Sequence, residues 1–130
     1  MKIERYEGRP GRPYVPAIKA APFVFTAGYT GFGPDGSVPE DFAQQVRNIL
    51  ERARTNLERA GSSLRHVISA TVYLTDHKRD RATLDEIFTE NFAEAPPTRC
   101  CVEVKALSDS TKRVEIQFVA ATVGEEQHVG

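Results

Sequence analysis

Two short segments near the C-terminal end of the chain place an arginine and a glutamate in strand-like patterns. Residues 96–104 read PPTRCCVEV and residues 113–118 read RVEIQF, and apolar and polar residues alternate in both. We expect Arg99 on the polar face of the first strand and Glu115 on the polar face of the second. If the strands are neighbours, both side chains share one sheet surface, where they can bind a small carboxylate and orient a water molecule. The same pattern is also typical of a solvated cross-strand ion pair without function.

The two cysteines of the chain are adjacent, so the alternation places them on opposite faces of the first strand. Cys100 shares the predicted apolar face with Val102 and Val104, whereas Cys101 lies beside Arg99 on the polar face. Adjacent cysteines cannot form an ordinary disulfide with each other, so we expect reduced thiols and a cytoplasmic setting. No histidine has a sequence relation to Cys101 that suggests a base. We therefore expect Cys101 to form a pocket wall rather than to act as a nucleophile.

Composition limits the possible classes of function. The chain has 130 residues, 40% of them hydrophobic and 27% charged, which predicts one globular domain over residues 1–130. Seventeen basic and eighteen acidic residues give a net charge of −1, which argues against a nucleic-acid partner. No apolar run approaches the ~20 residues of a membrane helix, so no membrane partner is expected. The scattered His66, His77 and His128 lack the spacing of a metal site, so no metal is expected.

Two motifs in the first third of the chain resemble ligand-binding sequences without matching them. Residues 8–13, GRPGRP, resemble the arginine arms that enter the minor groove of DNA. The proline between Arg9 and Gly11 interrupts that motif, so we expect a segment that packs over a sheet edge. Four glycines match no phosphate-binding pattern and are expected at turns and close approaches: Gly28, Gly31, Gly33 and Gly36.

Hydrophobic periodicity predicts an α+β fold. Helices are expected from about Pro39 to Gly61 and over residues 82–92, and strands over residues 23–28, 66–75, 96–104 and 113–123. In the strand at 66–75, the side chains expected to face the helices are Ile68, Ala70, Val72 and Leu74. Two helices can cover only one face of a mixed sheet. The other face is semi-polar, so we expect it to pack against copies of itself, with clefts between subunits that hold the arginine and the glutamate.

These residues resemble the Rid family of enamine/imine deaminases, also called YjgF/YER057c/UK114. The resemblance extends from about Pro13 to Ala121. Its most specific parts are PPTR-x-CVEV at residues 96–104 and VEI at residues 114–116. Supporting segments lie at residues 13–14, 23–28, 60–64 and 71–76.

The resemblance implies a chorismate-mutase-like α+β fold and a homotrimer with three sites at subunit interfaces. It implies that Arg99 grips a substrate carboxylate and that Glu115 orients or activates the attacking water. It further implies that Tyr14 lines the pocket and that main-chain groups near Cys101 hold the reacting nitrogen. The implied reaction hydrolyses small 2-imino or enamine carboxylic acids to 2-oxo acids and ammonia, without a metal or cofactor.

Departures from the family pattern leave the substrate open. Ala27 stands where a serine precedes Gly28, Tyr29 stands where a glutamine is common, and Asp85 corresponds loosely to a pocket asparagine. These changes reshape the predicted pocket and leave room for an aromatic ring-cleavage product such as an aminomuconate-like enamine. A non-catalytic trimer that binds a carboxylate metabolite, with a regulatory role, is the alternative from another class. An endoribonuclease is disfavoured by the balanced charge.

Overall fold

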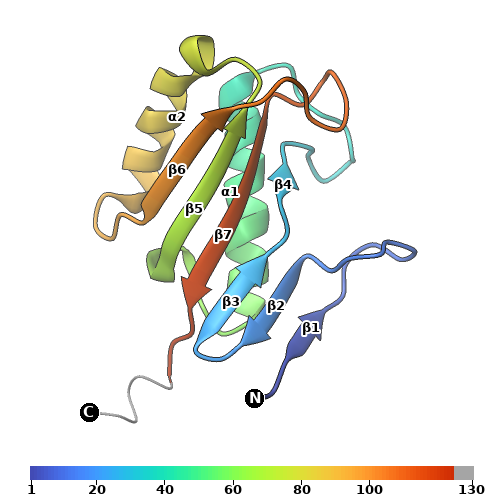
Figure 1. The fold of residues 1–130 in the computed structure, drawn as a ribbon, viewed down its shortest axis with the longest axis vertical. Helices are drawn as coiled ribbons and strands as arrows, with labels where there is room; N and C mark the ends of the chain where they lie inside the picture. The colour runs from blue at the N-terminus through green and yellow to red at the C-terminus, as the bar shows by residue number, and fades with distance from the viewer. Residues whose placement is uncertain (125–130) are drawn as a thin grey trace.

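A single mixed β-sheet carries both α-helices on the same face (Figure 1). The computed structural model describes residues 1–124. Its elements, in chain order, are β1 (Glu4–Tyr6), β2 (Ala17–Ala20), β3 (Phe23–Thr26), β4 (Tyr29–Thr30), α1 (Phe42–Arg59), the 3₁₀-helix η1 (Leu64–His66), β5 (Val67–Leu74), α2 (His77–Phe92), β6 (Thr98–Glu103) and β7 (Val114–Ala121). We call the covered side of the sheet the helix face and the other side the open face. The predicted α+β fold with two helices on one face is confirmed.

Strand β5 lies inside the sheet, between two neighbours of opposite direction. The strand order is β1-β2-β3-β7-β5-β6, and β4 also pairs with β7. β5 runs antiparallel to β7 and parallel to β6, and α2 provides the crossover that a parallel pair requires. β6 is therefore an edge strand of the described sheet, one strand removed from β7.

Of the four short strands before α1, the sequence pattern located only the one at residues 23–28. β1 pairs with β2 at one edge of the sheet. The segment at residues 8–13, which was expected to pack over a sheet edge, lies in the loop that joins these two strands. β3 and β4 both pair with β7, but residues 26–28 between the paired positions lie opposite only Gln117 and Phe118. This irregularity opens a break in the sheet at Ala27 and Gly28.

Helix α1 forms as its apolar stripe predicts. Asp41 caps its N-terminus by accepting a hydrogen bond from the Gln44 amide at 3.0 Å. Gly61, with a φ of 80°, ends it in the left-handed conformation that favours glycine. The apolar side chains of the stripe are buried: Phe42, Val46, Ile49, Leu50, Ala53 and Leu57.

Helix α2 begins at His77, five residues earlier than predicted from apolar spacing. Two carboxylates satisfy amides of its first turn, as helix ends require. Asp76 accepts from the Arg79 amide at 3.0 Å, and Glu103 of β6 accepts from the His77 amide at 2.9 Å. The first turn is therefore defined by its capping residues rather than by an apolar stripe.

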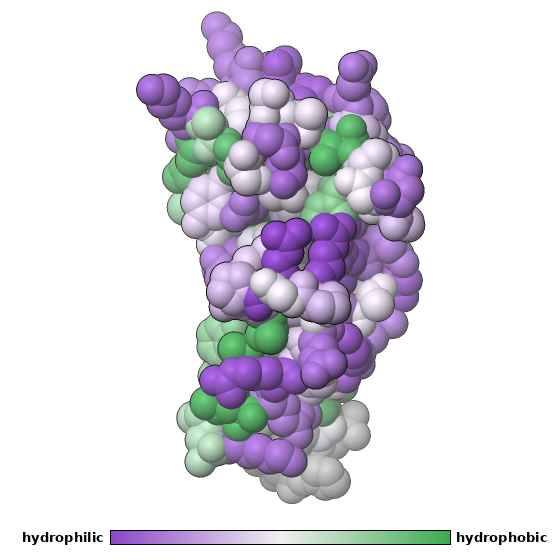
Figure 2. All heavy atoms as spheres, turned by 90° about the vertical axis from the view of Figure 1, so that its right-hand side faces the viewer, coloured by the Kyte–Doolittle hydropathy of each residue, from purple (hydrophilic) through white to green (hydrophobic). Residues whose placement is uncertain are grey.

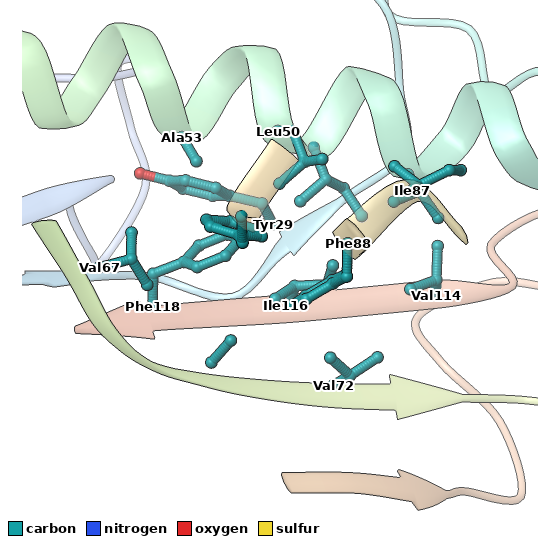
Figure 3. Close-up of a cluster of buried hydrophobic side chains, with 14 of the residues drawn as sticks. Tyr29, Leu50, Ala53, Val67, Val72, Ile87, Phe88, Val114, Ile116 and Phe118 are labelled. Carbon is teal, nitrogen blue, oxygen red and sulfur yellow. The ribbon is translucent and has the colours of Figure 1, made fainter. Parts of the chain in front are cut away.

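The core lies between α1, α2 and the helix face of β5 and β7 (Figure 3). Val114, Ile116 and Phe118 of β7 are fully buried, as their alternation predicts. On β5, the prediction for Ile68 is wrong, because its side chain is 44% exposed. A register shift between Val67 and Ser69 interrupts the alternation there, as a β-bulge does.

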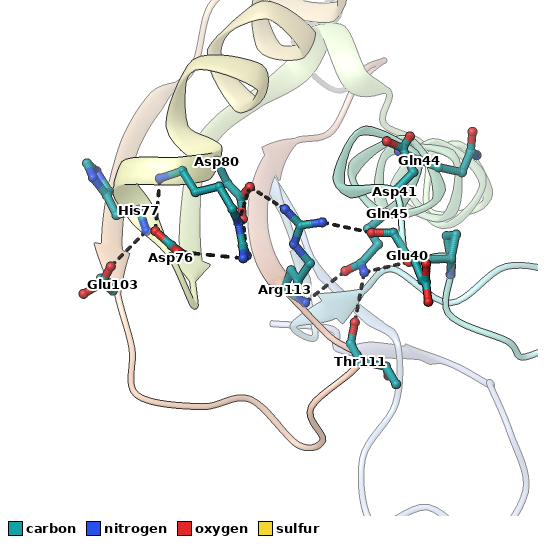
Figure 4. A network of polar contacts seen from close by, with 12 residues as sticks. Glu40, Asp41, Gln44, Gln45, Asp76, His77, Asp80, Glu103, Thr111 and Arg113 are labelled. Atoms are coloured by element: carbon teal, nitrogen blue, oxygen red, sulfur yellow. Dashed lines mark hydrogen bonds and ion pairs between the residues drawn. The ribbon is translucent and has the colours of Figure 1, made fainter.

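A polar network joins the start of β7 to both helices (Figure 4). Asp80 of α2 is 3% exposed and bonds the Arg113 guanidinium at 2.6 Å. Arg113 also donates to the Glu40 carbonyl at 2.9 Å, and its amide donates to the Gln45 side chain at 3.0 Å. Gln45 in turn donates to the Thr111 carbonyl at 3.0 Å. The network thus anchors the loop between β6 and β7.

We predict that Asp80→Ala destabilises the protein, because it leaves the largely buried Arg113 guanidinium without its counterion. The expected loss is about 3 kcal/mol of the free energy of unfolding, measured by urea denaturation. The control is Glu94→Ala, which removes the exposed partner of Arg65 and is expected to change nothing measurable. Equal midpoints for both variants would show that the Asp80–Arg113 pair does not stabilise the fold.

Candidate active site

Arg99 and Glu115 lie on opposite faces of the sheet, so the prediction that they share one surface is wrong. Strand β5 pairs with both strands and sets the two registers. Arg99 pairs with Ala70, which is buried beneath the helices, whereas Glu115 pairs with Tyr73, which points to the open face. Paired residues on neighbouring strands project to the same side of a sheet. Arg99 therefore lies on the helix face and Glu115 on the open face.

Arg99 faces the helices rather than the open face because β6 is an edge strand whose polar side chains bond to groups of α2. Arg99 pairs with Asp85 of that helix, and Glu103 caps its N-terminus. The predicted apolar side of the strand instead faces outward: Val102 is 39% exposed, and Cys100 is exposed as well. The alternation of β6 is as predicted, but its apolar set lies on the open face rather than in the core.

The first half of the candidate site is a pocket of about 700 Å³ around Glu115. It lies at the break between β3 and β4, where Tyr14, Ala27 and Gly28 also line it. A Cβ atom on Gly28 would lie 2.3 Å from Glu115 Oε2, so the absence of a side chain there allows the carboxylate its close approach. Within residues 1–124, the Glu115 carboxylate has no hydrogen bond or ion pair. It is therefore available to accept a proton or a hydrogen bond from a ligand.

Tyr29 lines this pocket from the side of the core, and its hydroxyl already forms two hydrogen bonds within the chain. The residue is 4% exposed, donates to the Pro16 carbonyl at 2.7 Å and accepts from Asn56 Nδ2 at 3.1 Å. Burial raises the pKa of the phenol to about 12. Tyr29 is thus a core residue that holds the segment following Tyr14, rather than the free pocket phenol that its sequence position suggested.

The second half of the candidate site surrounds Arg99. Its guanidinium lies 2.6 Å from Asp85 Oδ1 and 4.9 Å from the centre of the Phe88 ring, and the side chain is 18% exposed. It borders a smaller pocket of about 240 Å³, together with Pro96 and Pro97. The helix supplies the carboxylate and the aromatic ring, while the edge position of β6 leaves the guanidinium within reach of a ligand.

Cys101 packs beside Arg99 against the edge of the core. Burial raises the pKa of its thiol, which outweighs the opposing effect of the nearby arginines. A thiol with a raised pKa is protonated at neutral pH and is a poor nucleophile. The raised pKa thus argues against Cys101 as a nucleophile, and its position in a pocket wall stays a prediction.

Sequence reasoning did not include the basic residues that line the Glu115 pocket. These are Arg9, Arg12, Arg52 and Lys112. Arg9 and Arg12 belong to the GRPGRP segment, which directly precedes Tyr14. Because Tyr14 was a predicted pocket residue, this neighbourhood could have indicated that the two arginines line the pocket. Nothing in the sequence indicated Arg52, because the helical periodicity of α1 predicts an exposed position for it. Arg52 lines the pocket only because the sheet is broken at Ala27 and Gly28.

The remaining site classes have no support within residues 1–124. No group of three or more His, Cys, Asp or Glu in this part of the chain could hold a metal ion. His66 bonds the Ser63 hydroxyl, His77 lies in the first turn of α2, and His128 falls outside the described residues. No helix among the described elements has the length and apolar character to cross a membrane.

Comparison with known proteins identifies the family of the chain. The family model described as endoribonuclease L-PSP matches residues 7–122. The solved structure of Rv2704 from Mycobacterium tuberculosis, a member of the YjgF/YER057c/UK114 family, superposes with a TM-score of 0.75 at 34% identity, covering 84% of this chain and 86% of the other. The chain belongs to the YjgF/YER057c/UK114, or Rid, family. The predicted resemblance is therefore confirmed.

Other relatives within the Rid family carry names that refer to an activity. The 2-iminobutanoate/2-iminopropanoate deaminase of Escherichia coli K12 is 34% identical over 112 residues, covering 83% of this chain and 86% of that protein. A RutC family protein of Pyrococcus horikoshii is 40% identical over 114 residues, covering 86% and 89%. Imine deaminases thus occur among the proteins to which this Rid chain is similar.

We predict that Asp85→Asn strengthens the binding of a 2-oxo acid at Arg99. Asp85 occupies one amino group of the guanidinium and repels an incoming carboxylate, so its neutralisation should lower the dissociation constant about fivefold, as for a half-exposed ion pair. Titration calorimetry with 2-oxobutanoate measures this change. Glu86→Gln, one residue further along α2, removes the same charge from an exposed position and should have little effect. Weaker binding in Asp85→Asn would contradict competition and indicate that Asp85 orients Arg99.

Proposed function

We propose that the protein hydrolyses 2-imino or enamine carboxylic acids to 2-oxo acids and ammonia. The observation that carries the proposal is the unpaired Glu115 carboxylate, held against Gly28 in a pocket that Tyr14 also lines. An acid–base group without a partner in a cleft is what such a hydrolysis needs. The imine deaminase among the relatives supports the same reaction class.

In the proposed reaction, the Glu115 carboxylate accepts a proton from water as the water oxygen attacks the electrophilic imine carbon. The product of this addition is a carbinolamine, which carries a hydroxyl and an amino group on one carbon. With the imine nitrogen protonated at the outset, the addition leaves a neutral amino group, and return of the proton from Glu115 turns this group into an ammonium leaving group. The carbinolamine hydroxyl then loses its proton to the Glu115 carboxylate as the C=O bond forms and the C–N bond breaks, which releases ammonia and leaves the 2-oxo acid. General-base assistance of this kind contributes about 10²–10⁴-fold to a rate.

Arg99 is proposed to bind the substrate carboxylate. Its planar guanidinium can form two parallel charge-assisted hydrogen bonds, and it lies over the ring of Phe88. Because Arg99 and Glu115 lie on opposite faces of one sheet, with β5 between their strands, they reach a single small substrate only if different subunits provide them. The site is therefore proposed to form between neighbouring copies of the chain.

The open face supports such an assembly. Four large apolar side chains lie exposed on β3, β5 and β6: Phe23 (40%), Phe25 (43%), Ile68 (44%) and Val102 (39%). Clustered exposed apolar residues are typical of an interaction surface. A contact that joins two different surfaces of one chain generates a ring when its rotation closes, and a homotrimer is the ring that we propose, with one site at each interface.

A non-catalytic role would use the same pocket to bind a carboxylate metabolite, and turnover distinguishes it from catalysis. The matching family model is named after an endoribonuclease. The net charge of −1 argues against RNA cleavage by this chain, because an RNA-binding surface needs an excess of basic residues. The size of the Glu115 pocket favours a substrate larger than a three- or four-carbon imino acid.

The test is ammonia and 2-oxo acid release from imino acids that an amino-acid oxidase generates in the assay. Glu115→Gln keeps the shape of the side chain and should lower kcat about 100-fold with little change in KM, because only proton transfer is lost. Gly28→Ala should have a similar effect, because the new methyl group displaces the carboxylate. Arg99→Ala should instead raise KM, by about tenfold or more.

The control is Glu94→Gln, an exposed residue outside both halves of the candidate site that should retain full activity. An unchanged kcat in Glu115→Gln, or an unchanged KM in Arg99→Ala, would contradict the role assigned to that residue. A wild-type protein that binds 2-oxo acids without accelerating hydrolysis would favour the binding role.

A further inference from the structure

The Glu115 pocket contains more positive charge than a single-acid substrate requires. Three arginines line it: Arg9, Arg12 and Arg52. None of the three forms an ion pair with an acidic residue of the described chain. The net charge of the whole chain is −1, so this local excess of guanidinium groups is not a reflection of overall composition.

Arg52 is held in place by backbone carbonyls rather than by a counterion. It donates to the Thr30 carbonyl at 2.8 Å and to the Phe32 carbonyl, and its guanidinium carbon lies 3.7 Å from the centre of the Phe32 ring. Burial, together with a smaller contribution from Arg9, lowers the pKa of this guanidinium. A half-buried cation that is fixed in position and lacks an acidic partner is ready to bind an anion.

Arg9 approaches the same aromatic ring. Its guanidinium carbon lies 4.6 Å from the centre of the Phe32 ring, so two like charges stack on one side chain. Their mutual repulsion is unfavourable, and an anion bound between them would relieve it. Arg12 enters the pocket from the same N-terminal segment, between Arg9 and Tyr14.

The acidic residues that line the pocket do not cancel this charge. Lys112 is engaged with Asp109 at 3.5 Å, so these two residues neutralise each other. Glu7 and Glu115 remain against three arginines. Glu115 belongs to the proposed reaction centre. The side of the molecule that carries the N-terminal segment and β4 shows hydrophilic side chains in its middle and also toward its upper and lower ends, with hydrophobic ones among them (Figure 2).

The volume of the pocket agrees with a longer ligand. At about 700 Å³ it falls within the range of roughly 300–1,000 Å³ that accommodates drug-sized molecules. A three- or four-carbon imino acid would leave most of this space to water. A longer acid could extend from Glu115 to the arginines around Phe32.

We propose that Arg9, Arg12 and Arg52 bind a second carboxylate of the substrate, so that the protein acts on imines or enamines of dicarboxylic acids. This inference rests on the proposed deaminase function for the reaction itself. The first carboxylate is bound by Arg99 of a neighbouring subunit, the reacting carbon lies near Glu115, and the second carboxylate reaches the guanidinium groups beside Phe32.

The kinetic test compares imines generated from a five-carbon dicarboxylic amino acid and from alanine, each with a matching oxidase. Wild type should show a kcat/KM at least about tenfold higher for the dicarboxylic imine. The double variant Arg9→Gln/Arg12→Gln should lose this preference, because its KM should rise more for the dicarboxylic imine than for the alanine-derived imine. Arg52 is left intact because it also holds backbone carbonyls. Arg65→Gln, an exposed arginine distant in sequence from the pocket, is the matched control.

A binding measurement separates failure of this inference from failure of the proposed function. Titration calorimetry compares 2-oxoglutarate, 2-oxobutanoate and a 2-oxo acid that ends in phosphate, in wild type and in the double variant, whose fold is checked by circular dichroism. Tighter binding of 2-oxoglutarate, lost in the double variant, supports the second carboxylate site even if no imine is hydrolysed. Equal binding of the mono- and dicarboxylic acids, or no effect of the double substitution, would overturn it. Preferred binding of the phosphate compound would overturn the assignment to a carboxylate.

Discussion

The pairing of β5 with β6 on one side and β7 on the other is the constraint on which the candidate site depends. Once Ala70 pairs with both Arg99 and Phe118, the two-residue period of a strand directs Arg99 toward the helices and Glu115 away from them. A slip of one residue in either register would exchange buried and exposed faces, and the buried Val72, which pairs with Ile116, opposes it. The separation of the two polar groups is therefore as firmly determined as the core.

This separation connects three features that would otherwise be unrelated. An open face with exposed phenylalanines needs a partner, the Glu115 carboxylate lacks one within the described chain, and the Arg99 guanidinium is only partly satisfied by Asp85. The proposed assembly with a neighbouring copy of the chain would answer all three needs. The break at Ala27 and Gly28 then has a clear consequence, because it lets Arg52 on the helix face and Glu115 on the open face line one pocket.

Much of the fold follows from patterns in the sequence, and the failures have physical causes. The stripe of α1 and the buried face of β7 were predictable because each buries its apolar residues within the chain. The orientation of β6 was not, because alternation defines two faces without saying which one meets the core, and an apolar set on an edge strand can belong to an interface. Ile68 lies at a bulge, and the first turn of α2 depends on Asp76 and Glu103 rather than on apolar spacing.

The candidate site was predicted in part. Tyr14, Gly28 and Glu115 line one pocket, whereas Arg99, Cys101 and Asp85 form the other half of the candidate site.

The most direct test of the account is whether two impaired chains can restore each other's activity at substrate concentrations below KM. Arg99→Ala and Glu115→Gln would be unfolded together in equal amounts, refolded and assayed for imine hydrolysis. In a cyclic trimer, three of four random assemblies contain both variants and each carries one intact site in three, which predicts roughly a quarter of wild-type activity. A refolded mixture of Glu115→Gln with the double variant Arg99→Ala/Glu115→Gln has no intact site and should stay inactive. Failure of the first mixture to regain activity, in assemblies shown to be mixed, would contradict a site shared between subunits.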